Sequence, residues 1–194
     1  RTETGIAANP VSVSFAAVEL AKKIFGTLAG RKILIIGAGE MAELTCTHLV
    51  GNGAEDITVV NRSPAQARLL AEKFHGAAVG LEALDEALCD VDIVISSTGA
   101  PTYVVTGEMV RRCLRKRKNR LLFLVDIAVP RDIDPAADDL ENVYLYNIDH
   151  LQDIVDENIK NRRREALKAE AIIEEEVANY TNWLKELEAV PTIV

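Results

Sequence analysis

Apolar and polar residues alternate in short blocks along the first three quarters of the chain, and the blocks predict strands and helices in turn. Short apolar runs such as Ile33-Leu34-Ile35-Ile36 have the length of buried strands, whereas apolar residues that recur every three or four positions predict helices. The predicted strands are 32–36, 57–60, 77–79, 92–96, 121–126 and 143–146. The first predicted helix runs from Asn9-Pro10 to about Phe25 and is ended by Gly26. The other predicted helices are 40–51, 64–74, 81–88 and 106–118.

This alternation predicts an α/β fold in which helical crossovers join parallel strands with a right-handed sense. We expect a doubly wound, Rossmann-type, mostly parallel sheet, followed by a long C-terminal helix. Ligands of such sheets bind beyond the carboxyl ends of the strands, where the strand order switches. The segments 96–101 and 126–130 both fall at strand ends of this kind.

The turn that follows the first predicted strand has the pattern of a dinucleotide-binding turn, Gly37-Ala38-Gly39-Glu40-Met41-Ala42. Gly37 permits a tight turn, and Gly39 lets bare backbone approach a pyrophosphate. The helix that begins there offers unpaired N–H groups and partial positive charge to the phosphates. Ala42 stands where a third glycine often occurs. A tight turn without a ligand is the alternative, but strand, helix and spacing together favour a dinucleotide.

The end of the second predicted strand indicates which dinucleotide binds. Enzymes that prefer NAD place an acid there to hold the ribose 2′-hydroxyl, whereas this strand ends in Asn61-Arg62-Ser63. Arg62 can pair with a 2′-phosphate and stack on adenine, and Ser63 can donate a hydrogen bond to the same phosphate. Two charge-assisted hydrogen bonds of about 1.5–3 kcal/mol each predict a preference for NADP on the order of 10²–10⁴. Capping of the next helix by Ser63 is compatible with this role.

Two further segments at the same sheet edge are candidates for contact with the nicotinamide half of the cofactor. Thr98 and Gly99, with Ser97 beside them, could meet the nicotinamide ribose, and Ile127 and Ala128 could line the ring. Ordinary loop chemistry is an equally good interpretation of both segments. We interpret the acid that precedes the second segment, Asp126, as a turn or cap acceptor and not as an acid catalyst.

Residues 149–189 contain neither Gly nor Pro and predict one continuous helix, with Asp149 and Gln152 resembling a capping box. At about 1.5 Å per residue this helix runs about 60 Å, whereas a domain of about 150 residues has a radius of gyration of roughly 15 Å. We therefore expect the helix to project beyond the domain. Its apolar residues recur at three- and four-residue steps, a seam that helices use against partner helices: Ala166, Ala169, Ile173, Val177, Tyr180, Leu184 and Leu187.

Nothing else in the chain is expected to cover this seam, so we expect a second subunit to cover it in a homodimer. A solvated spacer helix fits Trp183, Leu184 and Leu187 badly. The expected organisation is an NADP-binding domain with a leading helix over residues 1–148, and a long helix that begins a dimerisation domain over residues 149–194.

Composition excludes several classes of protein. The 194 residues are 48% hydrophobic and 27% charged, and the net charge of −8 argues against a general nucleic-acid binder. No apolar run approaches the length of a membrane span, and the first residues do not form a signal peptide, so no membrane partner is expected. The three cysteines are far apart and form no C-x-x-C pair, which fits a reducing cytoplasm.

No catalytic and no metal-ligating residue is predicted. The arginines near Cys113 could lower the pKa of its thiol, but no His lies nearby in the sequence to complete a nucleophile. A basic cluster at a helix end is interpreted as a solvated face, with contact to an RNA backbone as the alternative; its members are Arg111, Arg112, Arg115, Lys116, Arg117, Lys118 and Arg120.

Six segments are similar to one enzyme family: Val11-Ser12-Val13-Ser14-Phe15-Ala16-Ala17-Val18-Glu19-Leu20-Ala21, Gly37-Ala38-Gly39-Glu40-Met41, Asn61-Arg62-Ser63, Ser96-Ser97-Thr98-Gly99-Ala100-Pro101, Asp126-Ile127-Ala128-Val129-Pro130-Arg131-Asp132-Ile133-Asp134-Pro135 and Asn142-Val143-Tyr144-Leu145-Tyr146. Together they resemble glutamyl-tRNA reductase over nearly the whole chain. The segment over 126–135 is far more specific to this family than the glycine turn.

The resemblance implies the function of the parent enzyme. The family reduces the glutamyl ester of glutamate tRNA to glutamate-1-semialdehyde with NADPH, the first committed step of tetrapyrrole (5-aminolevulinate) synthesis. Its members contain an N-terminal catalytic domain, an NADP domain and a dimerisation domain entered by a long helix, and this chain resembles the second and the start of the third. The resemblance implies that residues 37–42 bind the phosphates, that Arg62 and Ser63 select NADPH, and that Thr98 and Gly99 help to place the nicotinamide.

The family's nucleophilic cysteine, which forms a thioester with the glutamyl group, belongs to the N-terminal domain, and no position here matches it. We therefore expect a fragment that binds NADPH but reduces nothing alone. The partners implied are a second copy through the long helix, tRNA(Glu) through the parent protein, and the downstream aminotransferase. Ala42, where the family often has Gly, is the one departure at the glycine turn.

Two other functions stay open from the residues alone. A shikimate dehydrogenase-like protein shares the doubly wound domain and an Asn-Arg-Ser/Thr end to the second strand. Its Lys–Asp chemistry would need a further N-terminal domain, and the long helix is unexpected there. A non-enzymatic, self-associating NADP-binding module that senses redox state belongs to a different functional class.

Overall fold

The computed structural model describes residues 12–118 and 120–189, with side chains described as far as residue 185. Within this range Ser12–Val155 form one compact unit, and the residues from Asp156 onward belong to a second. None of the helices in these described ranges is both long enough and apolar enough to cross a membrane.

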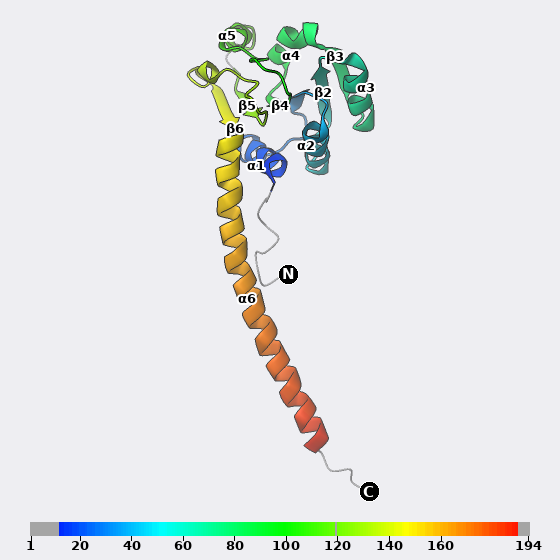
Figure 1. Cartoon of the computed structure of the whole chain (residues 1–194), viewed down its shortest axis with the longest axis vertical. Helices are drawn as coiled ribbons and strands as arrows, with labels where there is room; N and C mark the ends of the chain where they lie inside the picture. The colour runs from blue at the N-terminus through cyan, green and yellow to red at the C-terminus, as the bar shows by residue number, and fades with distance from the viewer. Residues whose placement is uncertain (1–11, 119, 190–194) are drawn as a thin grey trace. The chain divides into compact units, whose positions relative to one another are not determined.

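A six-stranded, fully parallel sheet organises the first unit (Figure 1). The strands are β1 Lys32–Ile36, β2 Asp56–Asn61, β3 Ala77–Gly80, β4 Ile93–Ser96, β5 Leu122–Asp126 and β6 Val143–Asn147. They lie in the order β3-β2-β1-β4-β5-β6, which reverses between β1 and β4. The predicted doubly wound parallel sheet is confirmed, and its switch point lies at the carboxyl ends of β1 and β4.

Helices cover both faces of this sheet. They are α1 Val13–Phe25, α2 Glu40–Gly51, α3 Pro64–Lys73, α4 Leu84–Asp90 and α5 Gly107–Lys116, with short 3₁₀ turns at Leu81–Ala83 and Pro135–Ala137. Leu34 and Ile36 of β1 pack in one buried cluster with Leu88 of α4 and Val110 of α5. Because side chains alternate along a strand, the equally buried Ile35 faces the opposite layer, on which α1 and α2 contact each other.

The first helix begins later than its predicted start at Asn9-Pro10, which lies outside the described residues. Ser12 is extended (φ −128°, ψ 147°), and its Oγ accepts a hydrogen bond from the Phe15 N–H at 3.2 Å, so α1 begins at Val13. This is ordinary N-capping by serine. At the other end Gly26, with φ +77°, ends the helix as predicted.

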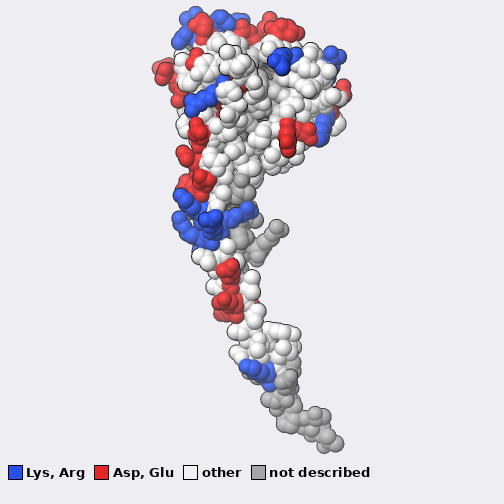
Figure 2. Space-filling model, in the orientation of Figure 1, with Lys and Arg blue, Asp and Glu red and all other residues white. Residues whose placement is uncertain are grey.

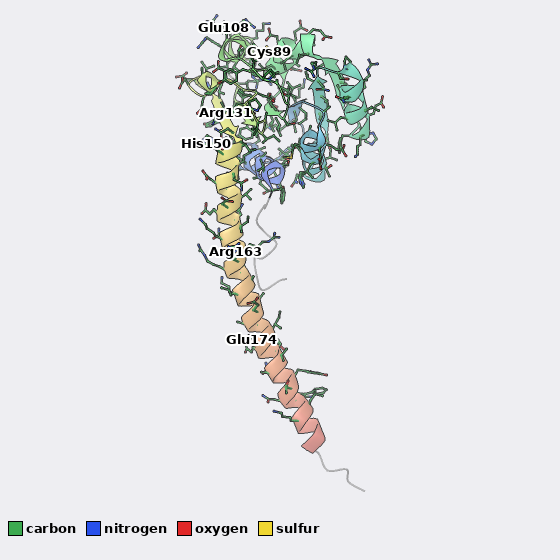
Figure 3. All side chains as sticks on the ribbon, viewed as in Figure 1. Cys89, Glu108, Arg131, His150, Arg163 and Glu174 are labelled. Atoms are coloured by element: carbon green, nitrogen blue, oxygen red, sulfur yellow. The ribbon has the colours of Figure 1, made fainter. Side chains whose placement is uncertain are left out.

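The long helix α6, Ile148–Ala189, is capped by Asn147 and not by the predicted capping box that starts at Asp149. Asn147 Oδ1 accepts from the His150 N–H at 3.0 Å, and His150 Nδ1 accepts from the Asn147 N–H at 3.4 Å. These two reciprocal hydrogen bonds cap the helix at Asn147, earlier in the chain than the predicted cap at Asp149. Asp149 instead forms an exposed ion pair at 3.2 Å with Arg131, whose position Figure 3 marks.

In the second unit, α6 exposes apolar side chains at three- and four-residue steps. The ring centroids of Tyr180 and Trp183 lie 5.7 Å apart. The side chain of Leu187, the last predicted seam residue, lies outside the described part. Charge along the same helix is banded, with basic side chains at 160–164 and acidic ones at 174–176 (Figure 2). The exposed fractions of the described large seam residues are Ile173 61%, Val177 58%, Tyr180 59% and Leu184 40%.

Arg117 does not belong to the solvated basic face that the sequence predicted. It is only 3% exposed, and its guanidinium donates hydrogen bonds to the backbone carbonyls of Cys89 (3.2 Å), Leu121 (2.8 Å) and Val91. Asp92 lies 3.8 Å from the same guanidinium. A run of basic residues gave no signal for this burial, because nothing in the run distinguishes Arg117 from its exposed neighbours.

Replacing Arg117 with Met should lower the free energy of unfolding by about 3 kcal/mol, because buried carbonyl groups lose their donor. Urea denaturation measures this change. Arg115→Met is the matched control, since Arg115 is exposed in the last turn of α5, the helix whose C-cap residue is Arg117, and should change stability by no more than about 0.5 kcal/mol. Equal losses in the two variants would contradict the structural role of Arg117.

Candidate functional site

A cleft of about 350 Å³ lies at the carboxyl edge of the sheet, at the switch point between β1 and β4. It brings together three predicted segments that are far apart in the sequence: 37–39, 61–62 and 97–99. Its lining residues are Ile36, Gly37, Ala38, Gly39, Asn61, Arg62, Gln66, Leu81, Ser97, Thr98, Gly99, Ala100 and Val104. None of these side chains carries a carboxylate.

The turn after β1 passes so close to the end of β4 that only glycine fits. Gly37 has φ +108°, and a Cβ on it would lie 2.7 Å from the carbonyl oxygen of Ser97. The Gly37 N–H donates to the Val60 carbonyl at 2.8 Å, and the Ser97 N–H donates to the Ile36 carbonyl at 2.9 Å. The turn is thereby tied to both neighbouring strands.

The N-terminus of α2 opens at this turn and has no side-chain cap. Its N-cap is Gly39, which is exposed, and a Cβ on Gly39 would meet no atom within 4 Å, so backbone alone faces the cleft. Uncapped helix N–H groups of this kind bind anions. Glu40 and Met41 are exposed but do not line the cleft, and Ala42 is buried against the sheet at 1% exposure.

The end of β2 forms a second wall with one exposed cation, Arg62. The Asn61 side-chain amide donates to Gln66 Oε1 at 3.0 Å and to the Ser63 carbonyl at 3.4 Å, which braces the turn beneath Arg62. Ser63 itself caps α3, because its Oγ accepts from the Gln66 N–H at 3.5 Å, and it does not line the cleft. The structure thus shows its capping role.

The loop after β4 is held from below by a buried aspartate that sequence reasoning did not select. Asp132 is fully buried, and its carboxylate accepts hydrogen bonds from Ser96 Oγ (2.6 Å), the Thr98 N–H (2.7 Å) and the Thr98 hydroxyl. The one feature of the sequence that could have pointed to Asp132 was its place in the family-specific segment over 126–135. Local spacing could not connect it with a residue 34 positions earlier.

The loop after β5 contributes support and not cleft surface. Ile127 and Ala128 are 5% and 3% exposed and do not line the cleft, although the Ile127 N–H donates to the Ser96 carbonyl at 2.9 Å, next to Ser97. Asp126 Oδ2 accepts from the N–H groups of Asp132 (2.9 Å) and Ile133 (2.8 Å), and its Oδ1 accepts from Ala128. Its predicted role as a turn acceptor is confirmed. Burial raises the pKa of the Asp126 carboxyl above its ordinary value, partly offset by these amides.

The cysteines are placed as structural residues. Burial raises the pKa of the Cys46 thiol to about 12 and that of the Cys113 thiol to about 12, and at Cys113 the lowering by Arg117 is smaller than the effect of burial. Cys89, on α4 (Figure 3), is half-buried and donates to the Asp85 carbonyl at 3.1 Å. Throughout the described ranges no group of three His, Cys, Asp or Glu is arranged to hold a metal ion.

Comparison with known proteins assigns the domain. Residues 19–154 match the family model described as shikimate / quinate 5-dehydrogenase, and residues 168–194 match that of the glutamyl-tRNAGlu reductase dimerisation domain. The chain belongs to the shikimate/quinate 5-dehydrogenase domain family, in the form found in glutamyl-tRNA reductases. The resemblance inferred from the sequence is confirmed, and the relatives are oxidoreductases.

The matching glutamyl-tRNA reductases are longer than this chain. The chain is 66% identical to that of Syntrophus aciditrophicus and 54% identical to that of Desulfatibacillum aliphaticivorans, in each case over 100% of this chain, and over 46% and 45% of the relative. It therefore spans about half the length of the curated relatives it matches.

Solved structures give the same picture. Glutamyl-tRNA reductase from Methanopyrus kandleri matches with a TM-score of 0.87 and 39% identity, covering 96% of this chain and 47% of that one. The nucleotide-binding domain of the Thermoplasma volcanium enzyme matches with a TM-score of 0.63 and 21% identity, covering 80% of this chain and 99% of that one, and shows the fold alone.

In the native protein at pH 8, Cys46 and Cys113 should react with a thiol reagent such as DTNB far more slowly than Cys89. A thiol with a pKa of about 12 is ionised to only about one part in ten thousand at this pH, and burial also limits access. Absorbance kinetics with and without denaturant measure the difference, and Cys89→Ser should remove the fast phase. Rapid reaction of all three native thiols would contradict the assignment.

Proposed function

We propose that this chain is the NADPH-binding part of a glutamyl-tRNA reductase. Its parent enzyme would reduce glutamyl-tRNA(Glu), through an enzyme thioester, to glutamate-1-semialdehyde in tetrapyrrole synthesis. The observation that carries the proposal is an acid-free cleft at the switch point, walled by bare backbone at Gly37 and Gly39 and by the exposed cation Arg62. Similarity to glutamyl-tRNA reductases over the whole of this chain, and over about half of each relative, supports the substrate class.

The residues of the cleft fit a phosphorylated dinucleotide. A Cβ on Gly37 would fill the space beside the Ser97 carbonyl, so glycine keeps this part of the turn open. The uncapped N-terminus of α2 offers N–H groups to a pyrophosphate. Arg62 would pair with the 2′-phosphate, because no lining carboxylate repels it and a guanidinium matches phosphate geometry. Absence of an acid at the end of β2 argues against NAD, which is normally held there by one.

The role of this chain in the reaction would be to position the cofactor. Bound NADPH supplies a hydride, and the protein supplies orientation and excludes competing reactions. The loop at Thr98 would hold the nicotinamide half, with Asp126 and Asp132 fixing the backbone beneath it. We assign the thioester-forming cysteine to a part of the parent enzyme outside this chain, since Cys46 and Cys113 are buried and Cys89 lies on α4, away from the cleft-lining residues.

The proposal includes the partners of the parent enzyme. These are tRNA(Glu), a second copy of the chain and the downstream aminotransferase, with the enzyme acting in the reducing cytoplasm that three unpaired cysteines suit. The second copy would cover the exposed seam of α6, where residues 168–194 match the dimerisation-domain model.

The isolated chain should bind NADPH about 100-fold more tightly than NADH, and should not turn over glutamyl-tRNA. Arg62→Glu should abolish the preference, because a carboxylate repels the 2′-phosphate that the guanidinium pairs with. Calorimetric titration with both nucleotides measures it. Arg68→Glu is the matched control, an exposed arginine on α3, and should keep the preference. Equal affinity of the unaltered chain for the two nucleotides would refute the role of Arg62.

Val177→Glu should convert a dimer of this chain to a monomer, because a charge in the middle of the apolar seam opposes burial against a second copy. Sedimentation velocity at about 50 µM protein distinguishes the two states, above the micromolar affinity that a modest helix interface supplies. Ala171→Glu places the same charge on the opposite, exposed side of α6 and should leave the dimer intact. An unaltered chain that sediments as a monomer would exclude this interface.

A further inference from the structure

The side chain of Thr98, on the wall of the cleft, has nearly all of its hydrogen-bonding capacity in use. Its hydroxyl donates to Asp132 Oδ1 at 2.5 Å and accepts from the Ala100 N–H at 3.1 Å. Its backbone N–H donates to Asp132 Oδ2 at 2.7 Å. Both the side chain and the backbone of Thr98 are therefore set by one distant carboxylate.

The chemistry of these partners fixes the direction of each hydrogen bond. An ionised carboxylate can only accept, and a backbone N–H can only donate. The single hydroxyl proton of Thr98 is thus committed to Asp132, and one lone pair of its oxygen is committed to Ala100. One lone pair remains. Toward the cleft, the Thr98 hydroxyl can accept a hydrogen bond but cannot donate one.

Asp132 is held firmly enough to impose this direction. Its carboxylate is fully buried and also accepts from Ser96 Oγ at 2.6 Å. Its backbone N–H donates to Asp126 Oδ2 at 2.9 Å, and its carbonyl accepts from the N–H groups of Val104 (2.7 Å) and Val105 (3.0 Å). Rotation of Asp132 away from Thr98 would leave several buried polar groups without partners, which is costly.

We propose that Asp132 is a positioning residue that presents the Thr98 hydroxyl as an acceptor for a ribose hydroxyl in the nicotinamide half of the dinucleotide. The inference rests on the proposed NADPH-binding function and names the part of the ligand that this loop recognises. Ribose hydroxyls can donate a hydrogen bond, whereas ionised phosphate oxygens only accept. The Thr98 hydroxyl therefore serves a ribose and not a phosphate.

Charge supports the same division of the cleft. The negative charge of Asp132 beneath the Thr98 loop disfavours an anion there, whereas the uncapped N-terminus of α2 and the guanidinium of Arg62 favour one. Phosphates are recognised at residues 37–39 and at Arg62, and the ribose is recognised at Thr98. The two kinds of contact use separate elements of the sheet edge.

Binding of two ligands tests this division. NADPH carries both halves, and adenosine 2′,5′-bisphosphate carries the 2′-phosphate but lacks the nicotinamide half. Thr98→Val removes the hydroxyl at nearly constant shape, and Asp132→Asn replaces one of the two acceptor oxygens of the carboxylate with an NH₂ donor. Each should weaken NADPH binding about tenfold and bisphosphate binding by less than about twofold.

The double variant tests whether the two residues act through one hydroxyl. It should bind NADPH no more than about threefold more weakly than either single variant, because effects through a shared group are not additive. Thr98→Ser, which keeps a hydroxyl, should bind NADPH more tightly than Thr98→Val. Equal NADPH binding by Thr98→Ser and Thr98→Val would overturn the proposal even where thermal unfolding shows that Asp132→Asn does not fold.

Asp134→Asn is the matched control for Asp132→Asn. The Asp134 carboxylate bonds the N–H groups of Gly107 and Ala136 and does not line the cleft, so this variant should bind both ligands like the unaltered chain. Additive losses of about a hundredfold in the double variant, or equal losses for the two ligands, would overturn the positioning role. If the unaltered chain binds neither ligand, the proposed function itself fails.

Discussion

The close approach of Gly37 to the carbonyl of Ser97 is the constraint on which the cleft depends. The chain leaves β1 between two neighbouring strand ends, bonded to Val60 on one side and to Ser97 on the other. A single methyl group would collide with backbone at 2.7 Å, so no other residue allows this path. Because the turn is so tight, α2 begins at the sheet edge with its free N–H groups directed at the switch point. The backbone conformation of one residue thereby determines where anions can bind.

A second principle is the separation of negative charge from the ligand surface. The cleft lining contains no carboxylate, although the chain carries 30 acidic residues. Asp126 and Asp132, which lie on the β5 end and the loop that follows it, are buried and bond the backbone of the loops around the cleft. Their charge is used to fix loop geometry from beneath, while the exposed cation Arg62 stands alone among the lining residues. Such an arrangement suits a polyanionic ligand that must also be oriented accurately.

The features that could be predicted from sequence are those encoded within a few residues. The glycine turn, the basic end of β2 and the Ser63 cap follow from local spacing, and alternation of apolar blocks gives the sheet. The pairing of Asp132 with Thr98 spans 34 positions and depends on the order of β4 and β5, which no local pattern reports. The burial of Arg117 was not predicted, because it depends on the backbone carbonyls of Cys89 and Val91, which are distant in the sequence. At the start of α6, Asn147 caps the helix in place of the predicted Asp149, and local spacing does not distinguish the two residues.

The buried Asp126 also shows how stability and positioning oppose each other in this domain. Burial raises the pKa of Asp126, so the folded chain takes up a proton there more readily than the unfolded chain does. By linkage, keeping this carboxylate ionised costs stability at neutral pH, and that cost declines as the pH falls through the folded-state pKa. The ionised form is the one that accepts from the amides of Ala128, Asp132 and Ile133 together. The domain thus tolerates an unfavourable buried charge because the same charge holds Asp132, and through it the wall of the cleft, in one geometry.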